Sequence, residues 1–496
     1  MYSAQKKRQG EQCLGVITAI RKTFARPVIR LGYPPLRVHE IKLGRTANLY
    51  LLLEPMNDKT AESAEEAKKS QPSFGPEIDL FCKHIDAIGD VLVGMVMAVQ
   101  EITKQSKEKL NKFENENCEV NDDGEERTVK IPNGHYREWK RLAQRFEHFN
   151  LSRVLLPRSL LVSLISQYDA YLGRLLRTTF IRKPEILNAS EKKISFEALS
   201  QFSSIDAARE YILEKEVESI LRSSHADQFK WMENTFFIPL TKDLASWPTF
   251  IELTERRNLF VHTDGIVSSQ YIAVCGLHKC KLDENTKEGQ RLGVPQEYFA
   301  DAHTCIYEIG VKLGHVLWRK LLPDERAAAD GHFISTTYEL IEKGKWDLAI
   351  RLLDFACTEF KKFSNEGSQL TLTVNRAQSY KWKGDEERCK RIMRAIDWSA
   401  KSDQFRLADA VLADDWARAV KVMRRIGKEG AVDQNDYRDW PLFREFRKQQ
   451  QFLDAFEEIF GTPFPKRSEV KKKEHVEEAP AEAADGQLAL PAPGAA

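Results

Sequence analysis

The sequence predicts a mainly α-helical protein with more than one domain. Its 496 residues are 42% hydrophobic and 30% charged, too apolar for a disordered chain and too charged for a membrane protein. From residue 76 onwards, apolar side chains recur at spacings of three and four, which indicates helices. Alternation typical of strands occurs within residues 13–53. At ~100–200 residues per domain, the length suggests two to four domains.

Residues 1–72 are expected to form a basic segment with short strands and a linker. β-rich runs at 13–20, 27–31 and 49–53 predict the strands, and residues 56–76 are small and charged. The first 50 residues carry ten Lys or Arg and two Glu, hence a local charge of +8 in a chain whose total is +1. This segment is a candidate anion-facing surface, but the whole chain lacks the basic excess of a dedicated duplex-DNA binder.

Residues 73–325 are expected to form a helical bundle with insertions. Apolar spacing and flanking turn residues predict helices over five ranges: 76–113, 157–180, 204–221, 248–262 and 295–322. Pro157 suits the first position of the second helix. Ser204 is the expected N-cap of the third, whose buried stripe begins at Ile205, and Gly265 suits the end of the fourth. An Asn-Asp-Asp-Gly turn is expected at 121–124.

Residues 326–465 show a repeating pattern. Gly344-Lys-Trp346-Asp-Leu-Ala349 is echoed 70 residues later by Asp414-Asp-Trp416-Ala-Arg-Ala419, and a degenerate copy with Cys389 at the small-residue position lies between them. The pattern resembles tetratricopeptide repeats, with an ordinary helical bundle as the alternative. A closing helix is expected over 440–460. Residues 466–496, dominated by Lys, Glu, Ala and Pro, are expected to be disordered.

The sequence also predicts a cellular location. Its longest apolar run, residues 88–99, is interrupted by Asp90 and is shorter than the ~20 residues that a bilayer crossing needs. We find no signal-peptide pattern. The eight cysteines are scattered without a Cys-x-x-Cys pair, which fits a reducing compartment. We therefore expect a cytoplasmic protein with no membrane partner.

Common enzyme signatures are missing from the sequence. It holds no phosphate-binding Gly-Lys-Ser/Thr loop, no dinucleotide fingerprint, no His-Glu-x-x-His and no serine elbow. Cys275-Gly-Leu-His278-Lys-Cys280 could in principle bind a metal, but three ligands on one loop lack a matching set, and buried thiols are the alternative. We expect no cofactor.

The most informative stretch is the helix that ends near His262. At ~100° per residue, four apolar residues fall in one arc, with Arg257 in its middle: Phe250, Leu253, Phe260 and Val261. A guanidinium there must be desolvated or point into a cleft. Arg256 falls on the other side, near Glu252, and is expected to face solvent.

Asn258 and His262 lie four residues apart and share a helix face, so they can line one groove with Arg257 if a second helix closes over it. This Arg-Asn-x-x-x-His run, its continuation to Ile266-Val267, and Gln167-Tyr168-Asp169-Ala170-Tyr171 on an earlier helix resemble one prokaryotic branch of the HEPN ribonucleases. The resemblance covers roughly residues 76–322. It implies a HEPN-like helical bundle with catalytic Arg257, Asn258 and His262, and with Asp169 and Tyr168 in support.

The resemblance also implies a metal-independent mechanism for cutting RNA. Neutral His262 would take the proton from a ribose 2′-OH, whose oxygen would attack the adjacent phosphate. Arg257 would stabilise the charge on the phosphate, Asn258 would orient the groups, and a 2′,3′-cyclic phosphate would result. The structural alternative is that His262 caps a helix and that Arg257 pairs with a carboxylate such as Asp169.

Partners follow from the same resemblance. The family's groove is completed by a two-fold partner, so a homodimer acting on RNA is expected. The repeats would offer a surface for a regulatory protein, as in a bacterial defence or toxin-like effector. The competing class is a non-catalytic scaffold that dimerises and binds RNA or protein.

Overall fold

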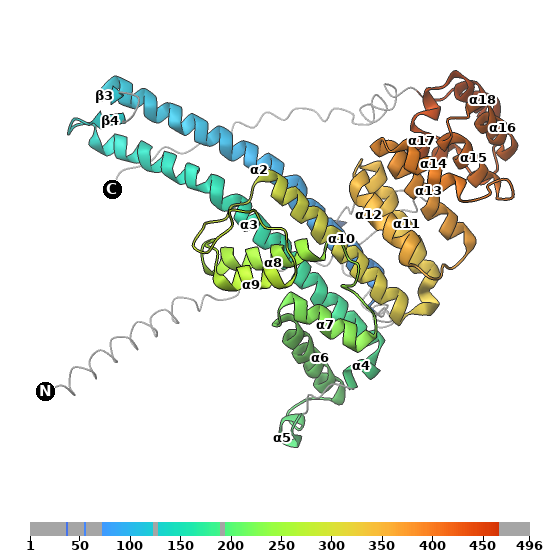
Figure 1. Cartoon of the computed structure of the whole chain (residues 1–496), viewed down its shortest axis with the longest axis horizontal. Helices are drawn as coiled ribbons and strands as arrows, with labels where there is room; N and C mark the ends of the chain where they lie inside the picture. Colours follow the sequence, from blue (N-terminus) through green and yellow to red (C-terminus); the bar gives the residue numbers. More distant parts are fainter. Residues whose placement is uncertain (1–35, 38–53, 56–71, 123–126, 189–193, 466–496) are drawn as a thin grey trace. The chain divides into compact units, whose positions relative to one another are not determined.

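The computed structural model is mostly helical, and Figure 1 shows its elements. It describes residues 36–37, 54–55, 72–122, 127–188 and 194–465. Within these residues, no helix is both long and apolar enough to cross a membrane.

The chain divides into two units, residues 1–70 and 71–496. In the first, β1 (Leu36–Arg37) pairs antiparallel with β2 (Glu54–Pro55). The three strands expected from the sequence and the tail expected to be disordered lie outside the described residues.

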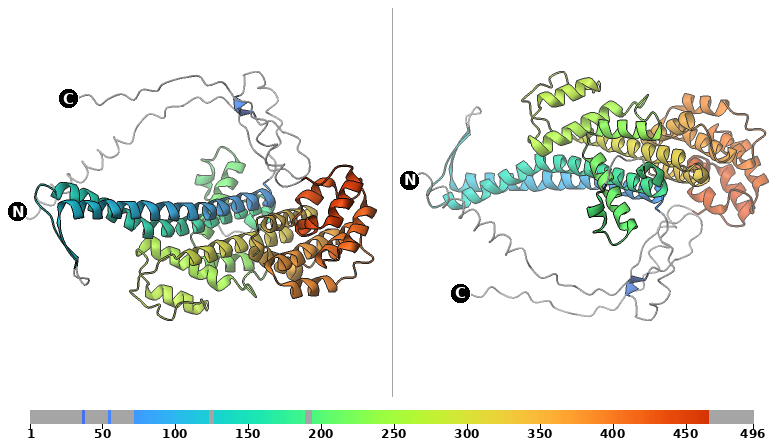
Figure 2. Two further views of the ribbon diagram at one scale, coloured as in Figure 1. Left: turned by 90° about the horizontal axis from the view of Figure 1, so that it is seen from above. Right: turned by 90° about the horizontal axis from the view of Figure 1, so that it is seen from below.

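Two long antiparallel helices, α2 (Phe74–Asn117) and α3 (Tyr136–Arg182), lie side by side (Figures 1 and 2). Phe81 of α2 stacks on Tyr171 of α3 with ring centroids 4.2 Å apart. At the other end of the pair, Trp139 Nε1 donates to Glu114 at 2.9 Å. An antiparallel hairpin, β3 (Glu119–Asp122) and β4 (Arg127–Lys130), joins the two helices.

The expected start of α3 at Pro157 is wrong, because the helix begins at Tyr136 and Pro157 lies inside it. An internal proline removes one backbone hydrogen bond, at a cost of about 3 kcal/mol. The buried stripe of α3 against α2 and its neighbours outweighs this cost; it includes Leu161, Leu164, Ile165, Leu172, Leu175 and Leu176.

α10 (Gln296–Leu321) packs against both long helices. Two glycines permit the close approach. A Cβ at Gly310 would lie 2.2 Å from the Phe81 ring, and one at Gly314 would lie 2.3 Å from the Tyr171 hydroxyl. That hydroxyl donates to Gly310 O at 3.0 Å. The helix expected over 295–322 is thus present and central to the core.

Four shorter helices follow α3: α4 (Pro184–Asn188), α5 (Phe196–Leu199), α6 (Ile205–Leu221) and α7 (His225–Phe236). The Ser204 cap is confirmed, since its hydroxyl accepts from Ala207 N at 3.1 Å. Ile205 is not part of the buried stripe, because it is 69% exposed. The C-terminal half of α6 contacts α3 through Val217 and Leu221 around Gly173, so the start of α6 remains in solvent.

α8 (Trp247–His262) matches the helix expected over 248–262, and α9 (Ser269–Leu277) follows it. The end of α8 is capped as the glycine suggested. Thr263 N and Gly265 N both donate to Leu259 O, at 2.9 and 3.0 Å. The left-handed backbone begins one residue earlier than expected, with φ of +52° at Asp264 and +80° at Gly265.

The remaining chain consists of helices linked by short turns: α11 (Arg326–Glu342), α12 (Trp346–Glu359), α13 (Glu366–Lys383), α14 (Glu386–Arg394), α15 (Asp403–Leu412), α16 (Trp416–Ile426), α17 (Gln434–Asp439) and α18 (Gln450–Phe460). Short 3-10 turns lie at Pro323–Glu325, Pro441–Arg444 and Phe446–Lys448.

Three helix pairs, α11–α12, α13–α14 and α15–α16, share one turn geometry. Each turn contains a residue with positive φ: Gly344 at +72°, Gly384 at +97° and Asp414 at +56°. The fourth residue of each second helix is small and buried, as expected for Cys389: Ala349, Cys389 and Ala419. The repetition therefore exists as helix hairpins with a shared turn.

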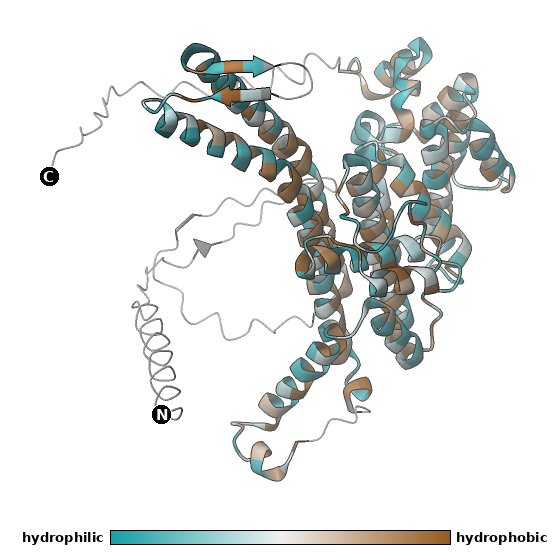
Figure 3. Ribbon diagram, turned by 60° about the vertical axis from the view of Figure 1, so that its left-hand side comes forward, coloured by the Kyte–Doolittle hydropathy of each residue, from teal (hydrophilic) through white to brown (hydrophobic). Residues whose placement is uncertain are grey.

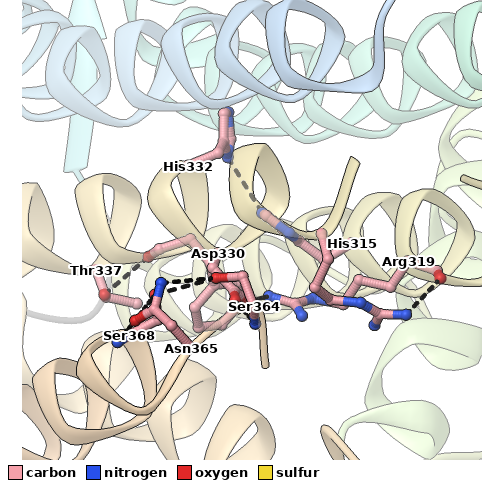
Figure 4. Close-up of polar contacts among 10 residues, drawn as sticks. His315, Arg319, Asp330, His332, Thr337, Ser364, Asn365 and Ser368 are labelled. Carbon is pink, nitrogen blue, oxygen red and sulfur yellow. Dashed lines mark hydrogen bonds and ion pairs between the residues drawn. The ribbon is translucent and has the colours of Figure 1, made fainter. Parts of the chain in front are cut away.

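A buried ion pair ties the first hairpin to α10 (Figure 4). Arg319 Nη2 lies 2.5 Å from Asp330 Oδ1, and Asp330 Oδ2 accepts from Ser364 N at 2.6 Å. The Arg319 guanidinium also lies 3.8 Å from the centroid of the Phe360 ring. One hydrophobic core runs through this junction, from Phe74 to Leu372.

Candidate active site

Arg257 leaves α8 half-buried and reaches α3. Its side chain is 22% exposed, and Nη2 lies 3.1 Å from Asp169 Oδ2. Its Nε is buried and has no hydrogen-bond partner among the described residues. On the same helix Phe250 and Leu253 are buried, whereas Val261, expected in the same arc, is 50% exposed. The position of Arg257 in the helix arc predicts a desolvated guanidinium. The guanidinium is only partly desolvated, and the Asp169 carboxylate compensates for this.

The Asp169 carboxylate has a second partner, a histidine that the sequence analysis did not predict. His225 Nε2 lies 2.8 Å from Asp169 Oδ1, so the two carboxylate oxygens face different groups. His225 is the first residue of α7, and its side chain is only 8% exposed. We call these three residues the Arg257–Asp169–His225 cluster. No spacing rule links a helix-start histidine to a carboxylate 56 residues earlier, so only the tertiary packing reveals it.

Tyr168, predicted as a supporting residue, is part of the core. Its side chain is fully buried, and its ring packs edge-on against Phe250 with centroids 5.1 Å apart. Burial raises the pKa of Tyr168 well above its ordinary value, so the phenol stays protonated. Its hydroxyl makes no hydrogen bond within the described part of the chain. Tyr168 therefore supports the packing of α8 on α3 and does not reach the surface.

Asn258 is half-buried and lies three residues after Glu255 on α8. Burial raises the pKa of the Glu255 carboxyl, and His225, the Asn258 amide and Arg257 oppose this rise. Asn258 thus belongs to a polar network that continues from the Arg257–Asp169–His225 cluster.

His262 is exposed at the last position of α8. Its side chain makes no hydrogen bond or ion pair among the residues that the structure describes. The structure therefore brings Arg257 and Asp169 together but does not bring His262 into contact with them. His262 is an accessible imidazole five residues beyond Arg257 on the same helix.

The loop that begins at Thr263 fixes the position of His262. Arg158 of α3 lies 3.1 Å from Asp264 Oδ1 and donates to Leu292 O at 3.0 Å. Leu292 N donates to Gly265 O at 2.8 Å, which pairs this loop with the segment before α10. The end of α8 is thus anchored both to α3 and to that segment.

The expectation that Arg256 faces solvent is wrong. Its side chain is 15% exposed, less than that of Arg257, and its Nε lies 2.7 Å from Glu252 Oε1. Its guanidinium lies 3.9 Å from the centroid of the Tyr298 ring. Tyr271 and Tyr298 both donate to the Glu252 carboxylate, at 2.6 and 2.7 Å. α9 and the start of α10 cover this side of α8, which a single-helix projection cannot show.

The cysteine loop does not gather a metal-binding set. No group of three or more His, Cys, Asp or Glu side chains in the described ranges could hold a metal ion. Cys275 is buried, and the His278 ring packs on Trp247 with centroids 6.0 Å apart.

Comparisons with models of protein families, with curated proteins and with solved structures found no match to this chain.

Proposed function

We propose that this protein is a metal-independent endoribonuclease of the HEPN type. The observation that carries the proposal is the layout of α8. Arg257, anchored through one nitrogen to Asp169, and the exposed imidazole of His262 reach solvent five residues apart, with Asn258 between them. An anchored cation for a phosphate and a free base for a 2′-OH are the two groups that such chemistry requires.

Each residue then has a role. Neutral His262 removes the 2′-OH proton, and the resulting oxygen attacks the neighbouring phosphorus and expels the 5′ oxygen of the next nucleotide, which takes up a proton. Arg257 neutralises charge on the phosphate oxygens, and Asp169 with His225 holds its guanidinium in one orientation. Asn258 positions the phosphate. The products are a 2′,3′-cyclic phosphate and a 5′-hydroxyl.

A second copy of the chain completes the proposed groove. Residues 91–99 of α2 carry no polar side chain, yet most of them are exposed, and a helix that is apolar all round is normally buried. Val91 is 49% exposed and Met97 is 63% exposed, and Figure 3 shows the hydropathy along the helix pair.

Gly94 supports a helix contact at the same place. It is exposed, and a Cβ added there would meet nothing within 4 Å among the described residues, so their packing does not require glycine. A helix-interior glycine costs roughly 0.5–1 kcal/mol relative to alanine. Close approach of a partner helix would account for that cost.

The helix hairpins after residue 325 are proposed to be tetratricopeptide-like repeats that bind a regulatory protein. Their repeated turn and their buried small residues, Ala349, Cys389 and Ala419, support this assignment. We place the protein in the bacterial cytoplasm as a defence or toxin-like effector that is restrained until its partner is sensed. The alternative is a non-catalytic scaffold, which is favoured by the engagement of Arg257 with Asp169.

Cleavage of RNA by the purified full chain in EDTA tests the proposal. We expect a labelled single-stranded RNA to be cut to fragments ending in cyclic phosphate, and a DNA of the same sequence to remain intact. His262→Ala should abolish cleavage, whereas His148→Ala, a change at an exposed histidine on α3, should leave it unchanged. Cleavage that needs added Mg²⁺, or that survives His262→Ala, contradicts the mechanism.

A further inference from the structure

Cys275 and Cys280 occupy a helix-ending turn that brings two side chains together. Cys280 N donates to Cys275 O at 2.8 Å, Lys279 N donates to Gly276 O at 3.2 Å, and Lys279 has a φ of +55°. These are the bonds of a Schellman motif, in which the residues joined by the outer bond typically contact each other through their side chains. At the end of α9, both of these residues are cysteines.

Cys280 packs against the small apolar cluster that contains Cys275. A hydrogen bond between the two thiols is the largest cause that lowers the pKa of Cys280 and also the largest that raises the pKa of Cys275. The Glu252 and Glu255 carboxylates on α8 oppose ionisation of Cys275, and Glu252 also opposes that of Cys280. Cys275 is fully buried and Cys280 is half-buried, so Cys280 is the accessible member of the pair.

The other described cysteines differ from Cys280 in the main cause that shifts the pKa of the thiol. Burial is the largest cause that raises the pKa of each of them: Cys82, Cys118, Cys305, Cys357 and Cys389. Thiolate is the reactive form, and oxidant-sensitive cysteines combine thiolate character, access to solvent and a neighbouring thiol. Within the described residues, Cys280 is the cysteine that combines these three properties.

We propose that Cys280 and Cys275 form a peroxide-oxidisable dithiol site. The Cys280 thiolate attacks one oxygen of hydrogen peroxide, which breaks the O–O bond and, after one proton is taken up, gives a sulfenic acid and water. The Cys275 sulfur then attacks the Cys280 sulfur, and the hydroxyl leaves as water with the Cys275 proton. In sum, two thiols and one peroxide become one disulfide and two waters.

The site lies against the candidate active helix but does not depend on the proposed nuclease activity. Cys275 packs in a small cluster with Leu259 of α8, Val267, Tyr271 and Leu292. The disulfide would therefore link the last turn of α9 to the segment that leads to α10. Tyr271, which donates to the Glu252 carboxylate, belongs to the same cluster.

Peptide mapping of the full chain tests the proposal. The protein is treated with hydrogen peroxide, its remaining thiols are blocked with N-ethylmaleimide, and it is digested with trypsin without reductant. Because Lys279 lies between the two cysteines, cleavage after it leaves them on separate peptides that only a disulfide joins. We expect this linked pair to form, and to form on the order of tenfold faster than any modification of Cys118, the half-buried control thiol.

Two variants assign the order of events. In Cys275→Ser, a dimedone probe should label Cys280 as sulfenic acid, because the resolving thiol is gone. In Cys280→Ser, Cys275 should remain unlabelled. Absence of the linked peptides while Cys118 is oxidised, or labelling of Cys275 in Cys280→Ser, overturns the proposal. Circular dichroism of both variants before oxidation establishes that they are folded.

Discussion

Arg256 and Arg257 are adjacent in sequence, but replacing each with alanine should change a different property. We expect Arg256→Ala to lower the stability of the fold and Arg257→Ala to abolish RNA cleavage. Arg256 is the cation facing the buried Glu252 carboxylate, whose side chain is 7% exposed. Removing it leaves that carboxylate with two tyrosine donors and no cation among the described residues, which costs about 3–5 kcal/mol for a broken buried pair. Asp169, in contrast, is 30% exposed and keeps His225 when Arg257 is removed, so about 1–2 kcal/mol is expected.

Urea unfolding of the full chain, followed by tryptophan fluorescence, measures the difference. Arg256→Ala should lower the midpoint of the first transition by about 1 M, while Arg257→Ala should lower it by much less. In the RNA-cleavage assay, Arg257→Ala should be folded and inactive. Arg256→Ala should cleave RNA in proportion to the fraction of the protein that is folded. Its activity should therefore be recovered at low temperature, where more of the variant is folded.

Arg256→Lys serves as the matched control, because it keeps the charge near Glu252 and loses the planar contact with Tyr298. Its stability should lie between those of the wild type and Arg256→Ala. A stable but inactive Arg256→Ala, or an unfolded Arg257→Ala, would refute this assignment of a structural and a catalytic arginine.

Three further outcomes are expected. Burial, followed by the charges of His332 and Arg319, lowers the pKa of His315 well below its ordinary value of 6.5. The unfolded state then binds the proton first, so unfolding free energy should fall as pH drops below 6.5, by up to about 1.4 kcal/mol per unit; His315→Gln should reduce this slope. Gly94→Ala should raise the unfolding free energy of the monomer by up to ~1 kcal/mol and weaken dimerisation, as measured by light scattering after gel filtration. Truncation after Leu322 should lower thermal stability, because it removes part of the core shared with α10; a fragment as stable as the full chain would contradict this.

Helix positions were predictable where apolar periodicity and caps agreed. The ranges of α8 and α10 and the Ser204 cap follow from local residues alone. The start of α3 could not be predicted from local residues. The cost of Pro157 inside a helix is a local property, whereas the contact with α2 that outweighs this cost involves residues far away in the sequence.

The candidate site also contains residues that the sequence predicts and residues that only the tertiary structure shows. The sequence motif predicts Arg257, Asn258 and His262 on one helix, and it offers Asp169 as a carboxylate that can pair with Arg257. The sequence does not indicate His225, and the solvent-facing position predicted for Arg256 is wrong. Both depend on neighbouring helices, α7 for His225 and α9 and α10 for Arg256, which no projection of α8 contains.

The contrast between the two arginines also separates the catalytic from the structural interpretation of the cluster. A purely structural arginine can be enclosed completely, as Arg319 is beside Asp330 and Phe360, where its side chain is 5% exposed. Arg257 is more exposed than Arg319, and its carboxylate partner is shared with His225. This arrangement holds one side of the guanidinium while leaving part of it accessible. Such partial anchoring is what binding a phosphate requires, because an enclosed guanidinium could not reach the substrate and an unanchored one would have to be ordered by it.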